Sequence, residues 1–197
     1  MKKIIGKVVV FLLAVNAIII LLITPSEKAN IGECNEFACK VNNFRLFASI
    51  DLYEKKEKIG TIKGNIFNNI IIEPLKMVGK DGKETANTSY NFNKQNARYI
   101  YVKENLTAEM VKVEKLFGSE YIICNKEGEK IAELKVKEKN KEGKIYDNQG
   151  ELIAEFFYNY FDANIVDIRI SKKCKLEEET VIMIFSAYYS DQNNKRK

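Results

Sequence analysis

The chain has 197 residues, of which 46% are hydrophobic and 11% aromatic, and this is enough to form the core of one globular domain. Its formal charge of +5 lies at the two ends: residues 1–7 and 195–197 carry six positive charges, which leaves residues 8–194 at −1. This distribution argues against a nucleic-acid partner. The absence of histidine removes the usual general base and the commonest metal ligand, and the other titratable residues follow no catalytic spacing. We therefore expect no enzyme, no catalytic residues, no metal site and no cofactor.

The first element is an apolar segment from Val8 to Ile23, preceded by three lysines within the first seven residues. Its length is close to the roughly 20 residues of a membrane-spanning helix, and a flanking lysine can extend it by snorkelling. A cleaved signal peptide begins in the same way, but the small residues of a cleavage site are poorly represented here. We expect residues 1–25 to be an uncleaved membrane anchor, with the following domain outside the cell membrane. Cleavage would instead make the protein secreted.

Residues 26–42 are expected to be a linker, and they contain Cys34 and Cys39. These two thiols are spaced to close a small disulfide loop in an oxidising compartment or to stay free in a reducing one, and the sequence leaves both open. Cys124 and Cys174 have the apolar neighbours typical of buried free cysteine. None of the four has the C-x-x-C spacing of a zinc site.

Residues 43–191 are expected to form one domain of antiparallel strands. The segment "NFRLFASIDLY" alternates apolar and polar residues over residues 43–53, the period-two pattern of a sheet with one buried face. The same period in "IAELKVK" places Ala132, Leu134 and Val136 inside. A further strand is predicted over residues 152–160.

Three segments repeat one template: "LKMVGKDGKETAN", "YIICNKEGEKIAE" and "GKIYDNQGELIAE". In each, an apolar strand enters a polar turn that ends in Gly82, Gly128 or Gly150, and the next strand carries an alanine. Glycine supplies the positive φ of a tight hairpin turn. Because one hairpin buries too little apolar area to be stable alone, we expect the hairpins to share a sheet that closes into a barrel.

A short helix is predicted at about residues 177–190, with three glutamates at its start, where the helix dipole favours acids. The following "VIMIFSAYY" is apolar on every side, so Ile184 and Phe185, which lie on different faces, should both be buried. The helix is far too short to cross a bilayer, which favours the inside of the barrel over a second membrane segment. Asp191 closes the helix, and residues 192–197 form a basic tail.

The x-x-x-G-x-x-x-A hairpins, followed by "FDANIVDIRI" and the terminal "VIMIFSAYYSD", resemble the tubby C-terminal-like superfamily, which includes the LURP-one-related proteins and the phospholipid scramblases. The resemblance covers about the last two thirds of the chain. It implies a closed barrel of about a dozen antiparallel strands around one central helix. Fold alone does not imply an activity.

Scramblases are similar in carrying an acidic calcium-binding loop in this segment. Asp162 matches the pattern, but the next acidic position falls on Asn164 and the last on Lys172 and Lys173, where the charge is reversed. Asp167 lies an odd number of residues from Asp162, so in a strand the two carboxylates point to opposite faces. We expect no calcium site and no effect of calcium on stability.

The sequence therefore predicts a membrane-anchored, non-enzymatic β-barrel domain that binds lipid, an envelope component or a protein partner next to the bilayer. One alternative is a scramblase-like protein with a lipid-handling activity, and another is an interaction module like the MORN repeats, which lack a buried closing helix. The strand "ARYIYV" interleaves aromatic and basic residues that could stack on a ligand, although tyrosine-rich strands more often stabilise a sheet.

Overall fold

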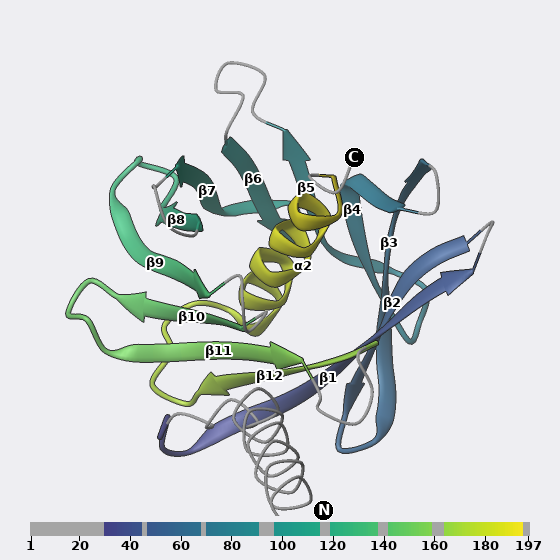
Figure 1. The fold of residues 1–197 in the computed structure, drawn as a ribbon, viewed down its shortest axis with the longest axis horizontal. Helices are drawn as coiled ribbons and strands as arrows, with labels where there is room; N and C mark the ends of the chain where they lie inside the picture. Colours follow the sequence, from purple (N-terminus) through teal and green to yellow (C-terminus); the bar gives the residue numbers. More distant parts are fainter. Residues whose placement is uncertain are drawn as a thin grey trace, which may run out of the picture.

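The computed structural model of the chain describes residues 30–44, 47–67, 70–90, 97–114, 119–137, 142–158 and 164–194. These residues form twelve antiparallel strands and one α-helix (Figure 1). The strands are β1 (Cys34–Phe44), β2 (Phe47–Glu54), β3 (Glu57–Phe67), β4 (Ile70–Gly79), β5 (Glu84–Tyr90), β6 (Ala97–Val102), β7 (Asn105–Glu114), β8 (Ser119–Cys124), β9 (Lys130–Lys137), β10 (Glu142–Asp147), β11 (Leu152–Tyr158) and β12 (Ile165–Ser171). The helix is α2 (Glu178–Asn194).

The sheet is a closed barrel in which each strand pairs with the next one along the chain and β1 pairs with β12. The closing ladder runs from the pair Cys34 and Ser171 to the pair Lys40 and Ile165. Closure leaves no strand with unpaired backbone groups along an edge of this sheet. The predicted closed antiparallel barrel is confirmed.

The predicted linker at residues 26–42 is wrong in its second half, because β1 begins at Cys34. Phe37, Cys39 and Val41 alternate with more exposed residues and are buried in the hydrophobic core. This period of two is the ordinary signature of a strand with one face inside. The barrel domain therefore includes β1, the strand whose pairing with β12 closes the sheet.

The alternating segment at residues 43–53 falls on two strands. In the structure β1 ends at Phe44 and β2 begins at Phe47, and these two residues pair across the two strands. The apolar alternation therefore belongs to two antiparallel strands joined by a very short connection. Ile50 and Leu52 of β2 are buried, as the alternation predicts.

Helix α2 lies inside the ring of strands, as Figure 1 shows. All eight residues from Val181 to Tyr188 are at most 4% exposed, including Ile184 and Phe185. A helix buried on every face needs surroundings on every face, and the barrel supplies them. The helix begins one residue later than predicted and extends to Asn194, so part of the predicted basic tail is helical.

The three repeated hairpins share one turn geometry. In each, the amide of Gly82, Gly128 or Gly150 donates a hydrogen bond to the carbonyl of the residue three positions earlier, at 3.0 to 3.1 Å. These glycines have φ between +78° and +83°, a region that other residues adopt at a cost. The pattern is a type I turn followed by a glycine bulge, the usual three-residue hairpin loop. The alanines of the template, Ala86, Ala132 and Ala154, are buried in the core.

Within the described part of the chain, no helix is both long and apolar enough to cross a membrane. The predicted anchor, residues 1–25, lies outside the described residues.

Candidate functional site

The interior of the barrel is packed with side chains of the strands and of α2. Phe156 of β11 contacts Phe185 and Tyr188 of the helix, with ring centroids 5.1 and 5.3 Å apart, and Tyr121 of β8 contacts Tyr188 at 5.9 Å. These side chains are all nearly inaccessible to solvent. These rings fill the space between β8, β11 and the helix.

Asp191, predicted to close the helix, makes the polar contacts that hold the last turn of α2. Its carboxylate accepts two hydrogen bonds from the guanidinium of Arg98 on β6, one of them at 2.8 Å, and one from the hydroxyl of Tyr121 at 3.2 Å. Burial and the charge of Asp191 raise the pKa of Tyr121 above its usual value, so this phenol stays protonated and donates. An acid at a helix C-terminus is unfavourable alone, and Arg98 offsets it. Arg98 is thus part of a buried ion pair of the fold. It does not belong to the ligand-binding surface that the segment "ARYIYV" suggested.

A pocket of about 500 Å³ lies on the outer surface where β2, β1, β12 and β11 run side by side. Its apolar lining includes Ala38 of β1, Phe157 of β11 and Ile165 of β12, and Tyr53 of β2 stands at its side. These positions alternate along their strands with residues of the barrel interior. The volume falls in the range of small-ligand pockets.

Basic residues outnumber acidic residues around this pocket. Lys40 of β1 and the turn residues Lys55 and Lys56 line it together with Arg169, against the acids Glu36 and Asp167. Among the described residues, neither Lys40 nor the two turn lysines have an ion-pair partner. The pocket therefore combines an apolar floor with ammonium groups that are available to an anion.

Lys55 and Lys56 form a two-residue turn between β2 and β3 with φ of 47° and 71°. Two successive positive φ values define a type I′ turn, which usually contains asparagine and glycine. Lys103 and Glu104 make the same turn between β6 and β7, and they do not line the pocket. The backbone strain alone does not mark a site, but the second turn provides a matched control for the first.

Arg169 lies at the wall of the pocket, between two carboxylates on the neighbouring strands. Its Nη1 donates a hydrogen bond of 2.7 Å to Glu155 on β11, and its Nε lies 3.3 Å from Glu36 on β1. Burial alone would lower the pKa of Arg169, but hydrogen bonds to Glu155 and Cys34 raise it. The guanidinium therefore stays charged, and its position is fixed by Glu155.

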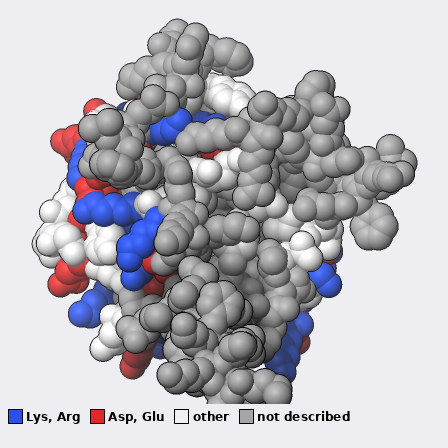
Figure 2. Space-filling view, viewed as in Figure 1, with Lys and Arg blue, Asp and Glu red and all other residues white. Residues whose placement is uncertain are grey.

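On the face shown in Figure 2, blue and red side chains alternate along the left side of the molecule, where Figure 1 places the hairpins of β8 to β11. Ion pairs of these hairpins, such as those of Glu133 with Lys130 and Lys135, account for the mixture. Such mixed surfaces are typical of solvated strands rather than of a binding patch. The pocket on the outer surface of β2, β1, β12 and β11 is the better candidate.

None of the four cysteines, all of which lie in the described residues, is part of a disulfide bond. Cys34 and Cys39 lie five residues apart in one extended strand, so their Cα atoms are separated by roughly 16 Å, whereas a disulfide needs less than about 7 Å. Of the two alternatives for this pair, the structure excludes the disulfide. Burial, together with the charge of Asp167, raises the pKa of the Cys39 thiol, which is unreactive in consequence. Cys124 and Cys174 are only partly buried, contrary to expectation.

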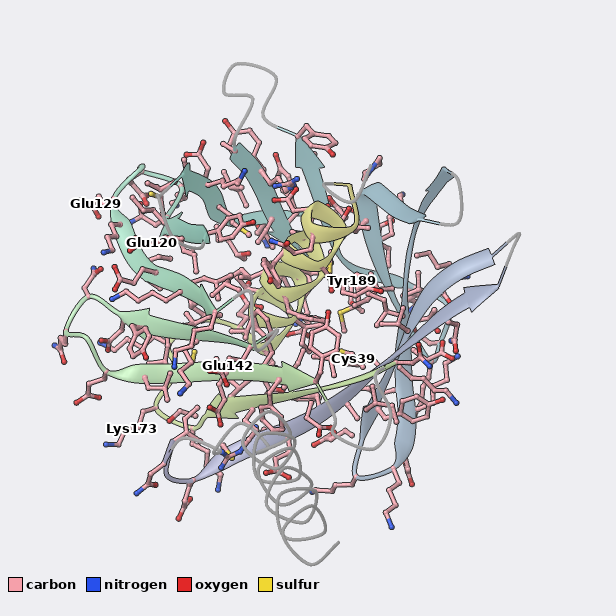
Figure 3. All side chains as sticks on the ribbon, viewed as in Figure 1. Cys39, Glu120, Glu129, Glu142, Lys173 and Tyr189 are labelled. Atoms are coloured by element: carbon pink, nitrogen blue, oxygen red, sulfur yellow. The ribbon has the colours of Figure 1, made fainter. Side chains whose placement is uncertain are left out.

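The acids of the scramblase pattern do not meet in the described part of the chain. Asp167 lies on the outer face of β12, while Val166 and Ile168 face the helix, and Lys173 extends from the outer edge of the molecule (Figure 3). Asp162 lies outside the described residues. Among the described residues no three potential ligands are placed to hold a metal ion. The expectation that calcium has no effect stays a prediction.

The pocket residues Lys40, Lys55, Lys56 and Arg169 were not singled out from the sequence. They come from three separated segments, which become neighbours only when β1 pairs with both β2 and β12. The doublet "KK" between two apolar strands was a usable signal for a turn, but it gave no indication of a pocket. The glycines Gly82, Gly128 and Gly150 and the core residues Ile184 and Phe185 have structural positions away from this pocket.

No known family model matches the chain, and no curated protein matches it. The fold is similar to the X-ray structure of a protein from Arabidopsis thaliana, with a TM-score of 0.55 over 81% of this chain and 92% of that chain. The two sequences are 8% identical. At this identity the likeness concerns the fold alone.

Proposed function

We propose that the chain is a membrane-anchored, non-enzymatic β-barrel domain that binds an anionic amphiphile, such as a membrane lipid, in the outer pocket. The observation that carries this proposal is the combination, in about 500 Å³, of an apolar floor at Phe157 and Ile165 with the ammonium groups of Lys40, Lys55 and Lys56. An acyl chain is stabilised on apolar surface and a charged head group by lysines at its rim. The filled barrel interior directs binding to this outer surface.

The apolar segment at residues 8–23 supports a place next to the bilayer, with the barrel on the extracytoplasmic side. Full-length protein should stay with membranes in carbonate extraction, and a chain beginning at Asn30 should be soluble. Recovery from cells of a mature chain beginning near Asn30 would show a secreted protein instead.

Lipid is favoured over an envelope component or a protein partner by the shape and size of the pocket. Among the described residues, Tyr90 is the one exposed large hydrophobic side chain, so this part of the surface has no broad apolar patch for a protein. Membership of the tubby C-terminal-like superfamily is part of the proposal, supported by a barrel around a C-terminal helix. The same buried helix argues against a MORN-like module. The packed interior argues against a scramblase-like activity in which lipid passes through the lumen of the barrel.

The test is flotation of the chain beginning at Asn30 with phosphatidylcholine vesicles, with and without phosphatidylglycerol. We expect binding that depends on the anionic lipid and that is lost when Lys40, Lys55 and Lys56 are all replaced by Gln. Lys103→Gln is the matched control, since Lys103 has the same turn geometry away from the pocket and should bind like wild type. Equal binding by the triple variant would contradict the assignment of the pocket.

A further inference from the structure

The two carboxylates that flank Arg169 differ in a way that suggests different roles. The side chain of Glu155 is 3% exposed, whereas that of Glu36 is 64% exposed and its contact with the guanidinium is the longer one. A buried, hydrogen-bonded ion pair is costly to break, because either partner alone would be left charged without water. An exposed ion pair contributes little and exchanges with solvent. Glu155 therefore holds Arg169, and Glu36 can leave it.

The three residues stand in one row across the outer face of β1, β12 and β11. Arg169 is paired in register with Glu36 on one side and with Glu155 on the other. Glu36 and Arg169 line the pocket, whereas Glu155 does not. An acidic group that enters the pocket meets Arg169 on the side that Glu36 occupies.

We propose that the Glu36 carboxylate occupies the place of the ligand's head group next to Arg169. An oxyanion head group displaces Glu36 from Arg169, while the apolar part of the ligand lies against Phe157 and Ile165. This inference rests on the proposed function and specifies how the pocket selects its ligand. The shared chemistry is a phosphate or carboxylate joined to an alkyl chain. A free anion lacks the contact with the apolar floor, and a neutral amphiphile lacks the group that competes with Glu36.

A consequence distinguishes this arrangement from simple attraction to lysines. Removing the internal competitor should improve binding, because the ligand no longer has to displace a carboxylate. Glu36→Gln should tighten binding about two- to fivefold, the range that corresponds to the loss of one exposed ion pair. Since Glu36 is largely exposed, the substitution should leave the melting temperature nearly unchanged.

The experiment is calorimetric titration of octyl phosphate into the full-length protein in phosphatidylcholine nanodiscs, with protein-free nanodiscs as the blank. Octanoate, octanol and inorganic phosphate are titrated in parallel, so that the head group and the chain are tested separately. Glu33→Gln is the control variant, because Glu33 pairs with Lys172 at 3.0 Å on the exposed surface away from the pocket.

We expect wild type to bind octyl phosphate and octanoate, but neither octanol nor inorganic phosphate. The Glu36→Gln variant should bind the two acids more tightly than wild type does. The Glu33→Gln variant should bind them like wild type. If wild type binds and Glu36→Gln binds equally or more weakly with an unchanged melting temperature, the role of Glu36 is wrong while the lipid pocket stands. If an anion binds without its alkyl chain, the pocket is an anion site and the inference about the amphiphile fails. Absence of binding to any probe by every variant would overturn the proposed function itself, and this inference with it.

Discussion

The two sides of α2 are packed in different ways. On one side its backbone lies closest to β4, β5 and β6, which we call the near wall. On the other side lie β8, β9, β10 and β11, which we call the far wall. There, aromatic rings bridge a wider gap between strand and helix. Figure 1 shows the helix off-centre in this sense. The helix thus lies off-centre in the barrel, and aromatic side chains fill the wider side.

The far wall also contains a glycine that this arrangement requires. A Cβ atom added at Gly143 of β10 would lie 2.2 Å from the ring of Phe156, far inside normal contact distance. The ring therefore rests directly on the backbone of β10. Phe156 occupies the space between that backbone and the helix, in contact with Phe185 and Tyr188.

The largest effect is expected from a charge placed on the helix, and it tests whether both walls exist. Ile184→Asp and Phe185→Asp each put a carboxylate in the core without a partner, which should unfold the domain. Lys175→Asp, at an exposed position before the helix, is the control and should be nearly silent. The measurement is the denaturant midpoint. Tolerance of aspartate at either position would mean that one wall does not cover the helix.

The next largest effect concerns the rings of the far wall. Phe156→Ala should cost about 3 to 5 kcal/mol of unfolding free energy, through the cavity that it leaves. Gly143→Ala should cost about 1 to 3 kcal/mol in the wild type, because the added methyl group overpacks the ring. In the Phe156→Ala background the same Gly143→Ala change should cost almost nothing. Additive costs in the double variant would show that Phe156 does not rest on β10 as described.

A smaller difference is expected between equivalent alanines of the hairpin repeat. Ala86 belongs to the near wall and Ala132 to the far wall, and both are fully buried. Ala86→Leu should cost about 1 to 3 kcal/mol, since the helix backbone next to β5 cannot move away. Ala132→Leu should cost less than half as much, because the gap between strand and helix is wider on the far wall. Chemical denaturation of both variants decides this, and equal costs would remove the distinction between the walls.

The smallest effect is the acid sensitivity of the two outer surfaces. Hydrogen bonds from Lys130 and Lys135 lower the pKa of Glu133, on the far wall, from 4.5 to about 2. A lowered pKa in the folded state means that the stabilisation is present above pH 4.5 and is lost as the pH falls towards 2. Glu133→Gln should reduce this acid loss of stability by at most about 1 kcal/mol, since water screens surface pairs.

Glu84 on the near wall provides the comparison for this acid effect. Its pKa is also lowered, mainly by its hydrogen bond with Lys76, and its side chain is more exposed than that of Glu133. Glu84→Gln should therefore change the acid limb of the stability profile less than Glu133→Gln. Melting temperatures between pH 2 and 6 give both values, and the opposite order would contradict the assignment.

The helix and the hairpins could be predicted because each has a local signal. A segment apolar on all sides requires an enclosure, and three glycine-ended turns of one template indicate how the enclosure is made. Strand β1 had an equally good signal in the alternation of Phe37, Cys39 and Val41. This alternation places Cys39 on the buried face of a strand, whereas the cysteine spacing by itself suggests a loop.

The pocket could not be predicted from such local signals. Lys40, Lys56 and Arg169 are far apart in the chain, and their proximity depends on the register of β1 with β2 and β12. Register over one buried face is fixed by the whole apolar pattern and not by the polar residues that it aligns. The positive φ of Lys55 and Lys56 is likewise imposed by the two strands that they join, since lysine has no preference for it.

The pairing of β1 with β12 also determines when the domain can fold during its synthesis. Strand β1 cannot pair with β12 until β12 has been synthesised, and α2, which fills the interior, follows all twelve strands. The barrel therefore cannot close around its core while the ribosome is still making β12 or α2. Contacts this distant in sequence make folding slow. Until α2 is released, the apolar inner faces of the strands stay uncovered and open to aggregation.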